Sequence, residues 1–147
     1  MGLVMVSVAK DIVEKEFISL GKEKSCLDAA KAMKAKKHGY VIVSSSRGVP
    51  EGMVTEWDFL AKVIAEGRDP ARVRLDEIMT SELVSVDAKT GLDEVAQLMA
   101  LKGIRRVLVL EDDTVLGVIT AATMLRRMKE YIDKISSQIA RLHSPMM

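Results

Sequence analysis

The chain has 147 residues, 48% of them hydrophobic, which is enough length and apolar material for one compact unit with a core. Aromatic residues supply only 3%, so that core must be aliphatic. Lysine and arginine (22) nearly cancel aspartate and glutamate (21), and this balance argues against an obligate nucleic-acid partner.

Cysteine and histidine are too few to build a metal site. Cys26 is the single cysteine, which excludes an internal disulfide, and His38 and His143 are too scattered to complete a zinc site with it. The apolar runs near the N-terminus and at 107–110 are too short for a signal peptide or a membrane span. We therefore expect a cytoplasmic protein with no metal, no required cofactor and no membrane partner.

The chain repeats itself with a period near 65 residues. A shift of 66 pairs Met33 with Met99, and after a one-residue deletion a shift of 65 pairs Thr55 with Thr120. A period of this length suits two small domains. The expected boundaries are 6–66 for the first repeat, 67–74 for a linker, 75–133 for the second repeat, and 134–147 for a C-terminal helix extension and tail.

The predicted elements of the first repeat follow the order β-α-β-β-α. An extended stretch at 17–20 precedes a helix whose apolar residues, from Cys26 to Met33, recur at helical spacing. A β-branched run at 40–43 and a polar turn come next. A short strand at 53–54 then leads into a second helix that opens at Thr55.

The second repeat has the same predicted order. Its extended stretch, helix, two strands and final helix lie at 83–86, 92–99, 107–110, 118–119 and from Thr120 onward. We therefore expect an α/β (α+β) fold of two tandem repeats with pseudo-two-fold symmetry.

The most informative motif is Gly52-Met-Val-Thr55-Glu-Trp-Asp58, where a strand turns directly into a helix. Gly52 permits a tight turn before the strand, and Thr55 is a good N-cap whose hydroxyl can meet a phosphate. Asp58 can accept hydrogen bonds from a ribose diol, and helix N-termini attract anions. The structural alternative is a capping box that only stabilises the helix. The occurrence of the motif in a duplicated context favours the interpretation as a ligand site over a capping box alone.

Two β-α-β-β-α repeats that each end in Gly-apolar-apolar-Thr before a helix resemble a tandem pair of cystathionine-β-synthase (CBS) domains, or Bateman module. The resemblance covers about residues 6–133. It includes 11–13 and 77–79, which are similar to the segment before the first strand of each repeat in that family. It implies a stand-alone, non-catalytic sensor whose regulatory ligand is an adenine nucleotide (AMP, ADP or ATP) or S-adenosylmethionine.

The resemblance also implies a ribose and phosphate site shared by the two repeats. It places Thr55 at the phosphate and Asp58 on the ribose hydroxyls. Arg105 and Arg106 begin the second central strand, where basic residues of the family reach the phosphates. The alternative for these arginines is a solvated strand end paired with nearby acids.

The opposite cleft departs from the family pattern. Thr123 stands where Asp58 stands in the first repeat, and Gly39 and Tyr40 stand where the second repeat has its arginine pair. We expect Thr120, Thr123 and Tyr40 to form a weak second site without ionised side chains, open at most to a less charged adenosine derivative.

The family analogy places the adenine against the first strand and the short strand before the motif. These positions are Phe17, Ile18, Met53 and Val54, for which the alternative is ordinary core packing. Trp57, in the motif helix, is expected to pack in the core or at an interface.

Apolar residues from Met124 to Leu142 form a helical stripe that is longer than one repeat needs. We expect this helix to meet its counterpart in a homodimer. The alternative is that it folds back on its own domain.

The predicted function is a regulatory module that relays ligand occupancy to an unidentified partner protein. No catalytic constellation is evident, because the carboxylates lack a base partner and Cys26 lies on a packing stripe. The alternatives are an enzyme of unknown type and a nucleic-acid-interacting stress protein; near-neutral charge and few aromatics count against the latter.

Overall fold

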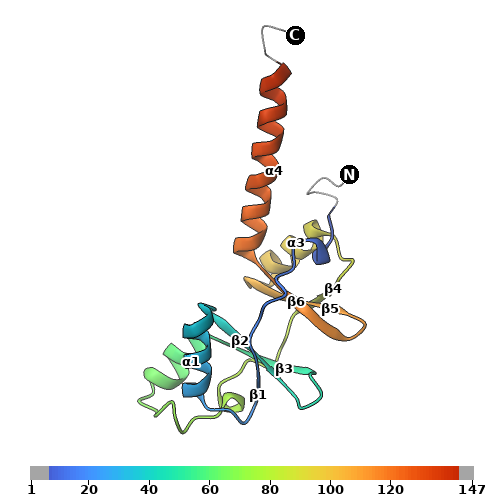
Figure 1. The fold of residues 1–147 in the computed structure, drawn as a ribbon. Helices are drawn as coiled ribbons and strands as arrows, with labels where there is room; N and C mark the ends of the chain where they lie inside the picture. Colours follow the sequence, from blue (N-terminus) through green and yellow to red (C-terminus); the bar gives the residue numbers. More distant parts are fainter. Residues whose placement is uncertain (1–6, 143–147) are drawn as a thin grey trace.

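The computed structural model describes residues 7–142. It contains two three-stranded sheets with helices around them and a long C-terminal helix, α4 (Ala121–Leu142), that projects from the body (Figure 1). The predicted α/β class, with two similar repeats and an extended C-terminal helix, is confirmed. Residue 6 and the tail at 143–147, which includes His143, lie outside the described residues.

The first repeat forms a sheet in the order β1-β2-β3, with β2 parallel to β1 and antiparallel to β3. Ser25 begins α1 by accepting a hydrogen bond from the amide of Asp28 (3.0 Å), and Lys37 ends it in the left-handed region (φ 57°). The elements are β1 (Ser19–Gly21), α1 (Cys26–Lys36), β2 (Tyr40–Ser44), β3 (Pro50–Thr55) and α2 (Glu56–Phe59), which continues as a π-helical turn (Leu60–Ile64).

The second repeat has the same topology, in the order β4-β5-β6. Its helix α3 ends at Gly103, which takes the left-handed conformation (φ 63°) at the position equivalent to Lys37. The elements are β4 (Ser85–Asp87), α3 (Leu92–Lys102), β5 (Arg106–Glu111), β6 (Thr114–Thr120) and α4.

The segment that precedes each repeat packs on the other repeat. Ile12 is buried in the core of the second repeat, and Ile78 is buried in the core of the first. The amide of Ala9 donates to the carbonyl of Thr90 (2.7 Å), which ties the N-terminal segment to the second repeat before it crosses to β1 (Figure 1). Val73, in the segment at 67–74, also enters the first core. The two repeats are therefore interlocked.

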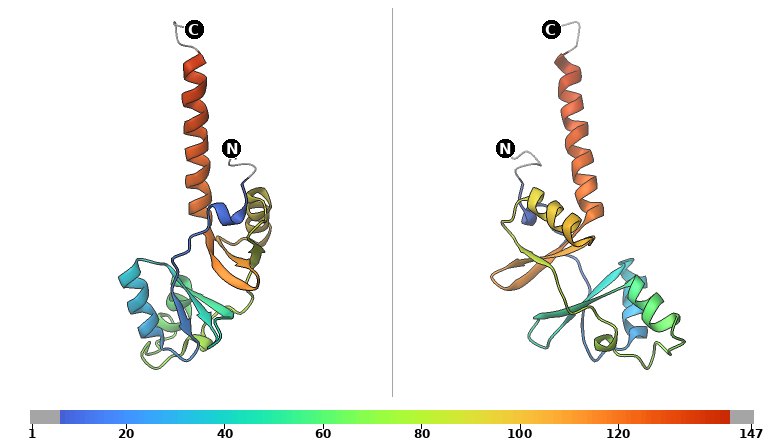
Figure 2. Two further views of the ribbon diagram at one scale, coloured as in Figure 1. Left: turned by 45° about the vertical axis from the view of Figure 1, so that its right-hand side comes forward. Right: turned by 180° about the vertical axis from the view of Figure 1, so that it is seen from behind.

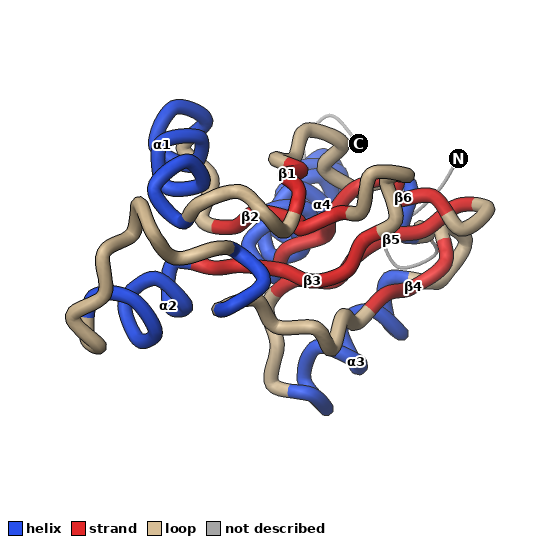
Figure 3. Tube along the Cα trace, turned by 90° about the horizontal axis from the view of Figure 1, so that it is seen from below, coloured by secondary structure: helices blue, strands red, loops and turns tan. Residues whose placement is uncertain are grey.

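A third apolar cluster joins the two sheets. Because side chains alternate along a strand, one face of each central strand packs on its own helices and the other faces the second sheet. Figures 2 and 3 show the strands in the middle of the body, with α1 and α3 on its outer sides. The fully or mostly buried members of this cluster are Tyr40, Ile42, Leu108 and Val118.

Two glycines allow another stretch of backbone to cross a strand. A Cβ at Gly117 would lie 2.2 Å from the carbonyl oxygen of Glu14, and one at Gly52 would lie 3.0 Å from that of Thr80. The amide of Glu14 donates to the carbonyl of Val118 (2.9 Å) at the crossing. Gly52 lies inside β3, so the structure requires it for close backbone approach and not for the tight turn before the strand that the motif predicted.

Candidate ligand site

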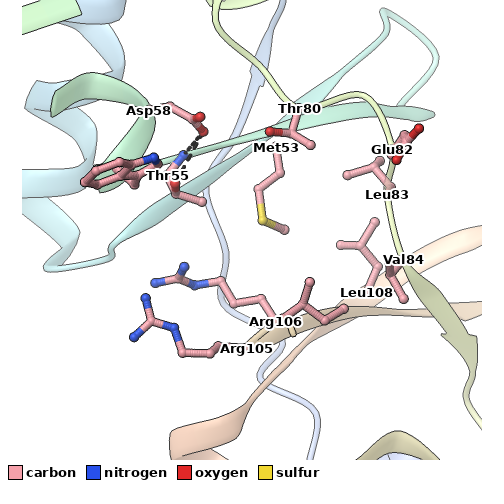
Figure 4. A pocket seen from close by; sticks show the side chains of 12 residues that line it. Met53, Thr55, Asp58, Thr80, Glu82, Leu83, Val84, Arg105, Arg106 and Leu108 are labelled. Carbon is pink, nitrogen blue, oxygen red and sulfur yellow. Dashed lines mark hydrogen bonds between the residues drawn. The ribbon is translucent and has the colours of Figure 1, made fainter. Parts of the chain in front are cut away.

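A cavity of ≈ 250 Å³, which we call cleft A, opens between the two repeats (Figure 4). It brings together all four residues predicted to hold ribose and phosphate, although they come from different repeats. Its lining consists of Met53, Thr55, Trp57, Asp58, Thr80, Glu82, Leu83, Val84, Ile104, Arg105, Arg106 and Leu108.

Cleft A has a polar end and an apolar end. Figure 4 shows Thr55 and Asp58 at one end, with the side chains of Arg105, just before β5, and Arg106, its first residue, reaching toward them. Leucine and valine side chains from β5 and the segment before β4 line the other end, where Thr80 and Glu82 of that segment add polar groups. Such a cavity suits a molecule with a flat apolar part joined to an anionic polar part.

Asp58 is almost fully buried, at 4% exposure, and its carboxylate is already hydrogen-bonded. It accepts hydrogen bonds from the amide and hydroxyl of Thr55 (2.9 and 3.3 Å) and pairs with the ammonium of Lys62 (2.9 Å). The capping role is therefore present in the structure. A ribose diol would have to share this carboxylate or displace Lys62, whose ammonium also donates to the carbonyl of Ile78 (2.8 Å).

The two arginines differ in their contacts. The guanidinium of Arg106 lies 5.2 Å from the ring centroid of Tyr40 and 3.7 Å from the carboxylate of Glu56, so the alternative of pairing with a nearby acid applies to it. Among residues 7–142, Arg105 makes no ion pair within 4.0 Å. Its guanidinium is available to an anion in cleft A.

Of the four residues predicted to contact adenine, the structure brings only Met53 to cleft A. Ile18 and Val54 are buried in the core of the first repeat, and Phe17 packs against the cluster between the sheets. Strand alternation explains the difference between neighbours, because Met53 faces the cleft and Val54 faces the helices.

The apolar wall of cleft A comes from the second repeat. The family analogy pointed to the equivalent segment of the first repeat. Leu83 and Val84 line the cleft, and they are the repeat equivalents of Phe17 and Ile18. The crossing of the repeats brings this copy to the first repeat's motif. Trp57 is not in the core: it is 68% exposed and lies at the cleft.

A second cavity of ≈ 270 Å³, cleft B, is the pseudo-symmetric counterpart. The predicted residues Thr120 and Tyr40 line it. The expectation that this cleft has no ionised side chain is wrong, because the crossing segments and the strand start place charges there. Its lining is Glu14, Lys37, His38, Gly39, Tyr40, Arg105, Arg106, Thr120, Ala121 and Ala122. The arginine pair therefore lines both clefts.

Thr123, the third residue predicted for the second site, meets a carboxylate from a distant segment. Its hydroxyl donates to Glu14, 109 residues away, and the same carboxylate lies 3.7 Å from Arg126. Thr123 and Glu14 together line a neighbouring cavity beside cleft B. A carboxylate is thus present where the sequence pattern had lost one, and only the crossing of the N-terminal segment reveals it.

Cleft B also holds two buried polar atoms without a hydrogen-bond partner in the described part of the chain. These are the hydroxyl of Tyr40 and Nδ1 of His38, whose rings stack with centroids 5.8 Å apart. Burial, reinforced by the Glu14 carboxylate and opposed by Arg106, raises the pKa of Tyr40 to about 12. The phenol therefore stays protonated at neutral pH and can donate a hydrogen bond.

Other sequence candidates give no further site. Cys26 is fully buried, and burial raises the pKa of its thiol to about 11, as suits a packing residue. Within residues 7–142, no group of three His, Cys, Asp or Glu side chains could hold a metal ion. Across the same range, no helix is long and apolar enough to span a membrane.

Two interlocked β-α-β-β-α repeats with a cleft at each end of their contact define a CBS domain pair. Residues 9–65 and 75–130 each match the CBS domain model, and the chain belongs to this family.

Relatives and solved structures agree with this assignment. The chain is similar to the CBS domain-containing protein YhcV of Bacillus subtilis, with 30% identity over 114 residues that cover 78% of this chain and 80% of the relative. Another relative is uncharacterized protein MK0525 of Methanopyrus kandleri, with 26% identity. The match covers 79% of this chain and 60% of that relative.

Among solved structures, the CBS domain pair of protein MJ0100 in complex with 5'-methylthioadenosine and S-adenosyl-L-methionine matches with a TM-score of 0.76 and 26% identity, over 85% of this chain and 98% of that one. A hexameric CBS-CP12 protein from bloom-forming cyanobacteria matches with a TM-score of 0.75 and 36% identity, over 82% of this chain and 67% of that one.

Proposed function

We propose that this CBS pair is a non-catalytic regulatory module that binds an adenine nucleotide in cleft A and relays its occupancy to a partner protein. The observation that carries the proposal is the convergence of Thr55, Asp58, Arg105 and Arg106 opposite an apolar wall. Tandem CBS domains are regulatory ligand-binding modules, and a structural neighbour that holds adenosyl ligands supports this ligand class.

The charges of cleft A favour a nucleotide over S-adenosylmethionine. Asp58, which is paired with Lys62, and Glu82 also line the cleft, and beside them two guanidinium groups, from Arg105 and Arg106, would repel a sulfonium. They match the oxygens of a phosphate, to which arginine can donate two parallel hydrogen bonds. The hydroxyl of Thr55 adds a further donor at the same end.

Cleft B is the second place for an adenosyl ligand in this proposal. The carboxylate of Glu14 at Thr123 replaces the acceptor that Asp58 supplies in cleft A, and the buried hydroxyl of Tyr40 offers an unused donor. The motif pattern alone indicated a depleted site, whereas the structure adds these two groups to it.

The shared arginines give the relay a physical route. An anion in cleft A would draw the guanidinium of Arg106 away from Tyr40 and Glu56, and that shift changes the wall of cleft B. From cleft B, the chain of contacts from Glu14 through Thr123 to Arg126 leads to the start of α4. A partner protein that contacts α4 or the body could read this shift.

The test is isothermal titration calorimetry with AMP, ADP, ATP, adenosine and S-adenosylmethionine. Arg105→Ala should weaken nucleotide binding by about tenfold to a hundredfold, the equivalent of one or more lost charged hydrogen bonds, and leave adenosine unchanged. Arg72→Ala, in a side chain that is 88% exposed and outside both clefts, is the matched control.

Four results would contradict the proposal. S-adenosylmethionine could bind more tightly than every nucleotide, or Arg105→Ala could leave nucleotide affinity intact. Recovery of a chemically altered nucleotide after prolonged incubation would identify an enzyme. Salt-dependent binding of single-stranded RNA without nucleotide binding would favour the nucleic-acid alternative.

A further inference from the structure

Lys37 has a backbone conformation that its residue type disfavours. It ends α1 with a positive φ of 57°, and the second repeat has Gly103 with φ 63° at the equivalent position. Glycine takes this left-handed conformation without the steric conflict that a Cβ causes, which is why it is the usual residue after a helix. In residues 7–142, the other non-glycine residues with positive φ are Asp112 and Asp113, of a type that tolerates the conformation better. A lysine at position 37 therefore costs stability that a glycine would not.

The end of α1 does not explain why this residue is a lysine. Cations stabilise the C-terminus of a helix, but Lys34 and Lys36 already lie in the last turn. Within residues 7–142, the ammonium of Lys37 makes no ion pair within 4.0 Å. Lys37 lines cleft B, whereas Lys34 and Lys36 do not. Its side chain therefore belongs to the cleft and is free to meet a ligand there.

The lining of cleft B is cationic. It carries three cations and one carboxylate, from Lys37, Arg105, Arg106 and Glu14. The carboxylate of Glu14 already accepts a hydrogen bond from Thr123 and lies 3.7 Å from Arg126. Arg106 lies 3.7 Å from Glu56, and the other two cations of the lining have no ion pair in the described part of the chain. This excess of positive charge favours an anionic ligand.

Hydrogen-bond donors lie in the same cleft. The hydroxyl of Tyr40, a residue that is 4% exposed, has no hydrogen-bond partner in the described part of the chain, and neither has Nδ1 of His38. A ligand that accepts a hydrogen bond from the phenol would satisfy this buried group. The start of α4 also lines cleft B, where the positive end of a 22-residue helix favours an anion. Together these groups match the oxygens of a phosphate.

We propose that Lys37 makes cleft B a phosphate site, in which its ammonium, the arginine pair and the Tyr40 hydroxyl bind free phosphate or the phosphoryl group of a nucleotide. This proposal depends on the proposed function only in treating the two clefts as ligand sites. It replaces the expectation that cleft B accepts at most a less charged adenosine derivative. Uncharged adenosine gains nothing from the ammonium, so Lys37 is the residue that gives this cleft its preference for phosphate.

Nuclear magnetic resonance titration of the full chain with inorganic phosphate, AMP and adenosine tests each cleft separately. The amides of Gly39 and Ala122 report cleft B, and the indole N–H of Trp57, the single tryptophan, reports cleft A. Lys37→Gly should raise the dissociation constant of phosphate at the cleft B signals by about tenfold, the equivalent of one lost charged hydrogen bond. It should leave adenosine affinity unchanged. The thermal midpoint should rise by about 2–4 °C, because glycine suits the left-handed conformation.

Two further variants sharpen the test. Lys36→Ala is the matched control, because it removes the same charge from the adjacent residue, which does not line cleft B, and should leave phosphate binding unchanged. Tyr40→Phe keeps the ring and removes the unpartnered hydroxyl. It should weaken phosphate binding in cleft B without lowering the thermal midpoint, since the free protein loses no hydrogen bond.

Several outcomes would overturn the proposal. The cleft B signals could respond to neither phosphate nor AMP, or Lys37→Gly could leave phosphate affinity intact. Weaker adenosine binding or a lower thermal midpoint in Lys37→Gly would show damage to the cleft in place of a lost contact. Equal weakening by Lys36→Ala would show that overall charge, and not Lys37, controls binding.

The remaining comparisons identify the source of the phosphate and separate this site from cleft A. AMP that binds cleft B at least tenfold more tightly than inorganic phosphate would make a nucleotide the ligand, and a smaller difference would make free phosphate the ligand. A Trp57 signal that does not respond to AMP, beside a phosphate response in cleft B, would refute the proposed function and support this site.

Discussion

Replacing Gly117 with alanine should destabilise the second repeat. The new Cβ would lie 2.2 Å from the carbonyl oxygen of Glu14 and 2.8 Å from Cγ2 of Val13. Neither strand nor crossing segment can accept such a contact, so one stretch of backbone has to move. Two hydrogen bonds hold the crossing, from Glu14 to Val118 (2.9 Å) and from Val118 to Glu14 (3.0 Å).

The expected loss follows from these contacts. Overpacking costs about 1–3 kcal/mol, and each weakened hydrogen bond adds about 0.5–1.5 kcal/mol. The free energy of unfolding should therefore fall by about 2–6 kcal/mol, a large share of the ~5–15 kcal/mol typical of a domain. Urea denaturation followed by circular dichroism measures this difference.

Gly21→Ala is the matched control, since its Cβ would also make a short contact, 2.4 Å from a carboxylate oxygen of Glu23. That oxygen is the end of a flexible, exposed side chain, which can rotate away, so the expected loss is within about 0.5 kcal/mol. If the two variants unfold at the same urea concentration, the crossing is not rigid and the argument fails.

Three further predictions concern single carboxylates. Asp58→Ala should lower stability by about 0.5–2 kcal/mol, as a lost helix cap does, and also weaken AMP binding in calorimetry; an unchanged affinity would leave only the capping role. Glu14→Gln should weaken adenosine binding at one of two sites per chain, and equal effects at both sites would refute the assignment of Glu14 to cleft B. Glu77→Gln should destabilise the protein at pH 7, and its difference from the wild type should shrink as the pH falls below 4.5. The Arg74 amide and then the Arg68 guanidinium lower the pKa of Glu77 from 4.5, so its contribution is present above that value and is lost as the pH falls through the lowered pKa. A difference in urea midpoint that does not shrink with falling pH would contradict this cause.

Periodicity and repetition along the chain were enough to predict the two repeats and the fold, whereas the residues at the polar end of cleft A were expected from the Gly52–Asp58 motif and the family resemblance. Helical and strand periodicities are local patterns. Because the same patterns recur at a fixed shift, the elements predicted in one repeat support those predicted in the other. The equivalence of Asp58 with Thr123 and of Tyr40 with Arg106 follows from that shift alone. The apolar stripe of α4 is local in the same sense, because it depends only on helical spacing.

Other features depend on the crossing of the repeats and emerge only in three dimensions. Each leading segment packs on the other repeat, so Leu83 lines cleft A in place of Phe17. The crossing also brings Glu14 to Thr123 and sets the arginine pair between two clefts. These contacts join residues far apart in the chain, where no local pattern links one to the other. The exposure of α4 is likewise a tertiary fact, because the same stripe would have suited a helix packed on its own body.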